Sequence, residues 1–111
     1  TGSPTYAANL AELVLEIIQH EQLTGDRLTG IFHYCNTGAT TWFEFANEIF
    51  LQSNITAIEI TPVSTFEYGA AAPRPAYSVL NCDKIRNKLN IHIPSWQDSL
   101  AVCLDQIRRH A

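Results

Sequence analysis

The stretch GIFHYCNTGATTWFEFA, residues 30–46, contains both kinds of secondary structure that the chain is expected to form. Residues 31–35 are short, aromatic and apolar on both sides, which is typical of a strand covered on both faces. Residues 36–38 then predict a turn. Thr41 and Glu44 have the spacing of a capping box, so a helix should begin directly after Thr41. This order of strand, turn and helix favours an α/β domain.

Helical periodicity precedes this stretch. The apolar positions 10, 13, 14, 17 and 18 form one stripe of an amphipathic helix, which should face the core. Asn9 is expected to cap this helix at its start, and Gly25 is expected to end it.

Three further elements are predicted in the second half of the chain. Residues 58–61 predict a second strand, and residues 62–75 an extended loop interrupted at most by a single turn at 64–68. Asp83 can cap a short helix, and Ser95 can cap a longer one. The predicted fold class is therefore α/β, a small mixed domain of about four helices with short strands.

Length and composition exclude several classes of protein. The 111 residues fit one domain, and with 46% hydrophobic residues they can bury a core. The formal net charge of −4 argues against nucleic acid as a partner. No apolar run approaches the ~20 residues of a membrane span, and no signal-peptide pattern is present. Cys35, Cys82 and Cys103 lack C-x-x-C spacing, which predicts reduced, buried thiols and a cytoplasmic location.

Catalytic and cofactor motifs are absent from the sequence. It contains no G-x-G-x-x-G, no phosphate-binding P-loop, no G-x-S-x-G, and no tyrosine followed four residues later by lysine. The four histidines lie far apart without metal-ligand spacing. Glu44 and Glu48 are interpreted as a solvated helix face rather than an acid–base pair. We therefore expect no catalytic, cofactor-binding or metal-binding residue in this chain.

The loop at residues 69–78 is the most unusual local feature of the sequence. Arg74 lies between two prolines, so its backbone is restricted and loses little entropy when the side chain binds an anion. Its planar guanidinium suits a phosphate or a carboxylate. From composition alone, pairing of Arg74 with a surface acid is an equal alternative.

Four blocks of the sequence resemble the dTDP-4-dehydrorhamnose reductase family of extended short-chain dehydrogenases/reductases. They occur in the order typical of that family and together extend over essentially the whole chain. The blocks are GSPTYAANLA at residues 2–11, residues 30–46, RPAYSVLN at residues 74–81, and the closing pattern of Leu89, Pro94, Trp96 and Leu100. The family aromatics at Trp42 and Trp96 are interpreted as core residues.

The resemblance implies that residues 1–111 are the C-terminal substrate-binding domain of a reductase. Such an enzyme reduces dTDP-4-dehydro-L-rhamnose to dTDP-L-rhamnose with NADPH. Its N-terminal Rossmann domain, which holds the cofactor and the catalytic Tyr-x-x-x-Lys pair, is absent from this chain. The implied partners are the dTDP-sugar, that Rossmann domain and, in a homo-oligomer, further copies of the protein. The isolated domain is expected to self-associate and to bind no NADPH.

The resemblance also implies which residues bind the substrate. Arg74 would contact the diphosphate, with Thr5 and Tyr77 as further substrate-binding residues. Tyr77 stands where the family usually has Asn, and Asn9 stands where it usually has Asp. Two alternatives therefore stay open: another nucleotide-sugar epimerase or dehydratase of the same superfamily, and a non-catalytic regulatory subunit.

Overall fold

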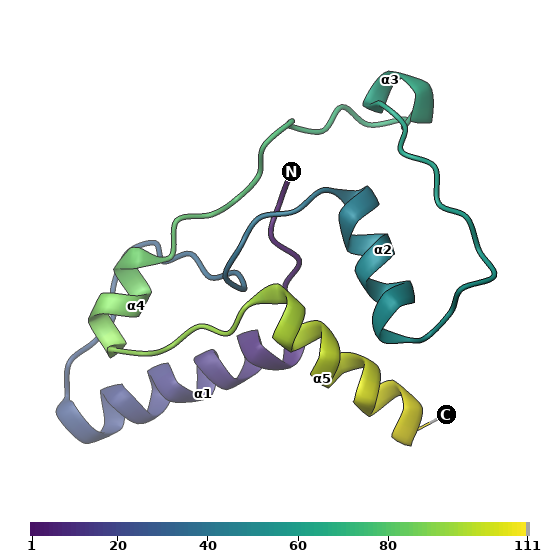
Figure 1. The fold of residues 1–111 in the computed structure, drawn as a ribbon. Coiled ribbons are helices and arrows are strands. Elements are labelled where there is room, and N and C mark those ends of the chain that lie inside the picture. The colour runs from purple at the N-terminus through teal and green to yellow at the C-terminus, as the bar shows by residue number, and fades with distance from the viewer. Residues whose placement is uncertain (111) are drawn as a thin grey trace.

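The computed structural model describes residues 1–110 as five helices joined by irregular segments (Figure 1). These are α1 (Ala7–Thr24), α2 (Trp42–Gln52), α3 (Thr65–Tyr68), α4 (Asp83–Leu89) and α5 (Trp96–Arg109). The capping predictions explain three boundaries. Thr41 and Glu44 form the capping box of α2, Ser95 Oγ accepts from the Asp98 N–H at the start of α5, and Gly25 ends α1 with a φ of 71°.

Neither predicted strand is confirmed in the described part of the chain. Residues 31–35 and 58–61 are irregular, and pairing within residues 1–110 is limited to two isolated bridges, Gly2–Thr40 and Thr37–Ser95. A strand is stable only when a neighbouring strand satisfies its backbone groups. The backbone of residues 32–34 makes no hydrogen bond in the described part of the chain. The described chain is therefore mostly helical, although its sequence pattern is α/β.

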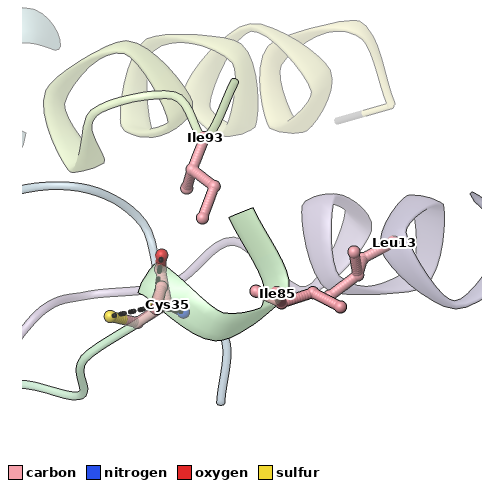
Figure 2. Close-up of a cluster of buried hydrophobic side chains, with 5 residues drawn as sticks. Leu13, Cys35, Ile85 and Ile93 are labelled. Atoms are coloured by element: carbon pink, nitrogen blue, oxygen red, sulfur yellow. Dashed lines mark hydrogen bonds between the residues drawn. The ribbon is translucent and has the colours of Figure 1, made fainter. Parts of the chain in front are cut away.

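A small hydrophobic core joins α1, α4 and the segments that precede α2 and α5. Leu13 of α1 and Ile85 of α4 face Cys35 and Ile93 (Figure 2), and Cys82 completes this buried cluster. Ile85 is fully buried. The predicted burial of thiols is confirmed for Cys35 and Cys82, whereas Cys103 on α5 is half-buried; all three are free.

A buried amide links three distant parts of the chain. Asn36 is 1% exposed, and its Oδ1 accepts a hydrogen bond from the Tyr6 N–H at 2.8 Å. Its Nδ2 donates to Asn9 Oδ1 at 3.1 Å and to the Pro94 carbonyl at 3.4 Å. The Ser99 hydroxyl donates to the same Asn9 oxygen at 2.6 Å. These bonds hold the start of α1, the turn after residue 35 and the start of α5 together.

The predicted N-cap at Asn9 is wrong. α1 begins at Ala7, and its N-cap residue Tyr6 makes no side-chain cap bond. Because Asn9 lies inside the first turn, its side chain is directed to the buried network rather than to the helix end. Asp83 is likewise the first residue of α4 rather than its cap, and its N–H donates to Asn81 Oδ1 at 2.9 Å.

The chain is more open than a compact domain of its length. Its radius of gyration is 17.0 Å, compared with about 13 Å expected for a compact domain of this length. Its accessible surface is 8284 Å², roughly 2,200 Å² above the ~6,100 Å² expected from its mass. One partner in a protein–protein interface of standard size buries about 800 Å². The excess is therefore large enough for a substantial further interface.

Apolar side chains contribute to this excess surface. Leu10, Val14 and Ile18 of α1 were predicted to face the core, but each is 45–49% exposed. Trp96 is buried as predicted, whereas Trp42 is 85% exposed, so its assignment to the core is wrong. The described chain has too few packed elements to cover these side chains. Leu10, Val14 and Ile18 follow one another at helical spacing on α1, and an apolar stripe of this kind is typical of an interaction site.

Asn36→Ala should lower the free energy of unfolding by roughly 2–4 kcal/mol, because it leaves several buried polar groups without partners. Urea denaturation measures this loss. Asn47→Ala on the exposed side of α2 is the matched control and should change stability by at most about 0.5 kcal/mol. Equal effects of the two variants would show that the buried network contributes nothing specific.

The isolated chain should self-associate through its uncovered apolar surface. Light scattering should give an average mass that rises with concentration above 12.4 kDa. Ile18→Lys should weaken this association, whereas Gln22→Lys, at another exposed position on α1, should have little effect. A mass of one chain at every concentration would contradict the expectation.

Candidate functional site

A cavity of about 430 Å³ lies where the turn after residue 35 meets the segment that leads into α4. Residues 35–38 and 79–83 line it, together with Ser3, Tyr77 and Arg86. We call it the Tyr77 cavity. Its lining combines buried side chains with exposed residues at the mouth.

The N-terminal residues hold one wall of the Tyr77 cavity in place. The Thr1 nitrogen donates to the Ala76 carbonyl at 2.8 Å, and the Ser78 N–H donates to the Thr1 carbonyl at 2.8 Å. Ser3 Oγ donates to the Gly38 carbonyl at 2.6 Å. The first residues therefore connect the loop around Tyr77 to the turn on the other side of the cavity.

Gly38 allows this turn to pass close to α5. Its φ is +99°, a conformation that side chains with a Cβ rarely adopt. A Cβ at this position would lie 3.0 Å from Cδ1 of the buried Trp96. Phe45 of α2 packs edge-on against the same indole, with ring centroids 5.9 Å apart. The turn thus rests on aromatic side chains from two helices.

The structure brings only one of the three predicted substrate-binding residues to the cavity. Tyr77 lines it. Thr5 lies behind the lining, where its Oγ1 donates to the Ser3 carbonyl at 3.0 Å and accepts from the Asn36 N–H at 3.3 Å. Arg74 is exposed on the same loop as Tyr77, outside the lining. It makes no hydrogen bond or ion pair with any residue from 1 to 110, so pairing with a surface acid is not observed there.

The cation that lines the Tyr77 cavity is Arg86, which the sequence analysis did not single out. Its Nη1 donates to Asp83 Oδ1 at 2.8 Å, and the two side chains are 38% and 68% exposed. Such an exposed ion pair contributes little stability, so an anionic ligand can compete with Asp83 for the guanidinium. No motif marks Arg86. The one sequence signal for Arg86 is the helical pattern of α4, which places this residue on the outer face of the helix.

Two thiols form part of the cavity wall. Cys35 Sγ and Cys82 Sγ lie 3.5 Å apart, and both residues are buried. Burial raises the pKa of the Cys82 thiol, and its hydrogen bonding with Cys35 adds to the rise. The thiol is therefore protonated near neutral pH and is a poor nucleophile. With Asp83 held by Arg86, the cavity is equipped to bind a polar ligand rather than to perform acid–base chemistry.

A second cavity, of about 440 Å³, lies between α4 and the segment of residues 27–32 that follows α1. Two of the three cations in its lining, Lys84 and Lys88, already have partners. Lys84 Nζ donates to the Ile31 carbonyl at 2.8 Å and lies 4.3 Å from the Phe32 ring centroid, and Lys88 pairs with Asp26 at 2.7 Å. The Lys88 ammonium group and the His20 ring lower the pKa of Asp26. None of the predicted site residues lines this cavity.

Among residues 1–110, no group of three or more His, Cys, Asp or Glu side chains could hold a metal ion. No helix in this part of the chain is both long and apolar enough to cross a bilayer.

A family model described as "RmlD substrate binding domain" matches residues 1–109. A Bacillus subtilis relative, the spore coat polysaccharide biosynthesis protein SpsK, is 38% identical over 105 residues. This alignment covers 95% of the chain and 34% of that protein.

Two solved structures of dTDP-4-dehydrorhamnose reductases resemble the fold. The Bacillus anthracis enzyme, solved in complex with NADP, is 40% identical with a TM-score of 0.72, and the match covers 89% of this chain and 33% of the enzyme. The Clostridium acetobutylicum protein is 32% identical with a TM-score of 0.84, covering 96% of this chain and 36% of that protein. The chain thus spans about a third of the length of the relatives that it matches.

Proposed function

This chain belongs to the RmlD substrate binding domain family, and we propose that it is the substrate-binding domain of a dTDP-4-dehydrorhamnose reductase. In that role it holds dTDP-4-dehydro-L-rhamnose while the C4 ketone is reduced to give dTDP-L-rhamnose. The observation that carries the proposal is the family match over residues 1–109, supported by two solved reductases with TM-scores of 0.72 and 0.84.

The cofactor in this proposal is NADPH, bound by a separate N-terminal Rossmann domain. The residues of this chain do not fit a dinucleotide, because the sequence has no glycine-rich turn that could bring backbone N–H groups against a pyrophosphate. NADPH bound to the other domain supplies the hydride for the ketone. A ligand site between two domains requires a wall from each. This chain contributes the wall that binds and orients the dTDP-sugar.

The N-terminal domain has a suitable docking surface on this chain. Ile31 is 75% exposed, and the backbone groups of residues 32–34 are unpaired within residues 1–110. We place a strand of the missing domain beside residues 31–35, where it would satisfy these groups and complete the strand that the sequence pattern predicts. The excess accessible surface of the isolated chain supports the same arrangement.

The substrate diphosphate is assigned to the loop that carries Arg74 and Tyr77. Arg74 offers a guanidinium fork with no competing carboxylate among residues 1–110. Arg86 offers a second cation at the Tyr77 cavity, three residues after its partner Asp83. Two cations near one phosphate-binding loop suit the charge of a nucleoside diphosphate sugar. Thr5 contributes indirectly through its hydrogen bonds to the cavity wall.

A second candidate is an epimerase or dehydratase acting on another nucleotide sugar. It is favoured by Tyr77, which lines the cavity at a position where the family usually has Asn. A regulatory subunit would share this domain but lack the Tyr-x-x-x-Lys pair in its other domain. The three free cysteines fit a reducing compartment, so we place the protein in the cytoplasm in each case.

Replacing the proposed phosphate ligand tests the substrate assignment in the intact protein. Arg74→Ala should raise the KM for dTDP-4-dehydro-L-rhamnose about 10- to 100-fold, because a hydrogen bond to a charged group is worth ~1.5–3 kcal/mol. The affinity for NADPH should not change. Arg74→Lys should recover part of the loss, since a point charge does not reproduce the guanidinium fork.

Arg109→Ala is the matched control for steady-state kinetics. Arg109 is also exposed, but it pairs with Asp105 at 3.1 Å in the last turn of α5. This variant should leave KM unchanged. If Arg74→Ala lowers the melting temperature and leaves KM unaltered, Arg74 has a structural role and the phosphate assignment is wrong.

A further inference from the structure

Cys35 and Cys82 are arranged as a pair rather than as two independent buried thiols. Their sulfur atoms are 3.5 Å apart. The Cys35 N–H donates to Cys82 Sγ at 3.2 Å, and Cys82 Sγ lies 3.8 Å from the Cys35 carbonyl oxygen. Both sulfurs also approach the Leu80 carbonyl oxygen, at 3.5 and 3.7 Å. The backbone on both sides of the pair thus keeps the sulfurs in contact.

The pair borders the Tyr77 cavity. The two cysteines are only 7% and 5% exposed, but both contribute to the lining of the Tyr77 cavity. The third cysteine, Cys103, lies on α5 outside this lining and is half-buried. Cys35 and Cys82 therefore form the pair to be tested, and Cys103 is an internal control for the oxidation of a single thiol.

We propose that Cys35 and Cys82 form a site of reversible covalent modification, which hydrogen peroxide converts to a disulfide in the wall of the Tyr77 cavity. In the first step one sulfur attacks the peroxide, so that an S–O bond forms, the O–O bond breaks and water leaves. In the second step the other sulfur attacks the resulting sulfenic acid, the S–S bond forms and a second water leaves. Overall, two thiols are oxidised, one peroxide is reduced, and both thiol protons end in water.

The reduced pair is stable until an oxidant arrives. Burial raises the pKa of the Cys82 thiol and so favours its protonated form, which reacts slowly. Once one sulfur is oxidised, the second is already in contact with it, so disulfide formation competes well with further oxidation to sulfinic acid.

Disulfide formation would change the cavity. The sulfur–sulfur distance would fall from 3.5 Å to ~2.05 Å, which draws the segment around Leu80 toward the turn after residue 35. Resting on the proposed function, we expect oxidised protein to bind dTDP several-fold more weakly than reduced protein. Dithiothreitol should restore the affinity.

Peptide mass spectrometry of the intact protein tests the proposal. After treatment with hydrogen peroxide, alkylation of free thiols and digestion without reductant, a peptide that joins Cys35 to Cys82 should account for most of the lost thiols. Its mass should be lower by two hydrogen atoms than the sum of the two thiol peptides. Dithiothreitol should abolish it, and Cys103→Ser should leave it unchanged.

The proposal is overturned if peroxide that oxidises Cys103 leaves Cys35 and Cys82 as free thiols, or oxidises them separately to sulfinic acids. Cys35→Ser and Cys82→Ser should each remove the joined peptide, and circular dichroism checks that they fold. Because the wild-type measurement needs no sugar ligand, it is independent of the proposed function. A missing disulfide with normal dTDP binding would reject only the modification site.

Discussion

The buried amide of Asn36 is the interaction on which the rest of this structure depends. A polar side chain that is 1% exposed is stable only when all of its hydrogen-bonding groups have partners, and those partners come from the start of α1 and the segment before α5. Hydrophobic contacts alone are few in this chain and do not specify direction. The hydrogen bonds of the Asn36 amide do specify the relative orientation of the segments, because each bond restricts both a distance and an angle. Cys35, Thr37 and Gly38 lie next to this amide in the chain and line the Tyr77 cavity with it.

The same constraint explains why a loosely packed chain can hold a defined site. The network and the small core around Ile85 order one end of the molecule, whereas the loop that carries α3 extends away from it (Figure 1). Ligand-binding loops are often drawn from the less stable parts of a protein. Hydrogen bonds join this loop to the first residues of the chain, from the Ser78 N–H to the Thr1 carbonyl and from the Thr1 nitrogen to the Ala76 carbonyl. The exposed apolar side chains and the unpaired backbone near Ile31 have no such local support, which fits a domain completed by another domain.

Local signals in the sequence predicted the helices well. The capping box at Thr41 and Glu44, the cap at Ser95 and the glycine stop at Gly25 act within a few residues, so the sequence contains all the information that they need. The strand predicted at residues 31–35 is not formed because no other described segment pairs with its backbone, and pairing between distant segments is not visible in a local pattern. The assignment of Trp42 to the core was wrong for a similar reason, because the apolar character of a side chain does not indicate which surface covers it. Of the residues that line the Tyr77 cavity, the family resemblance pointed to Tyr77 but not to Arg86, whose position there results from the tertiary packing of α4.

Hydrogen–deuterium exchange on the intact protein is the most direct test of the central claim, that this chain binds the nucleotide sugar while another domain binds the cofactor. Amide exchange should be followed with dTDP alone and with NADPH alone. The account predicts that dTDP slows exchange in residues 35–38 and 76–82, and that NADPH slows exchange only outside residues 1–111. Protection of residues 35–38 and 76–82 by NADPH, with none from dTDP, would contradict it.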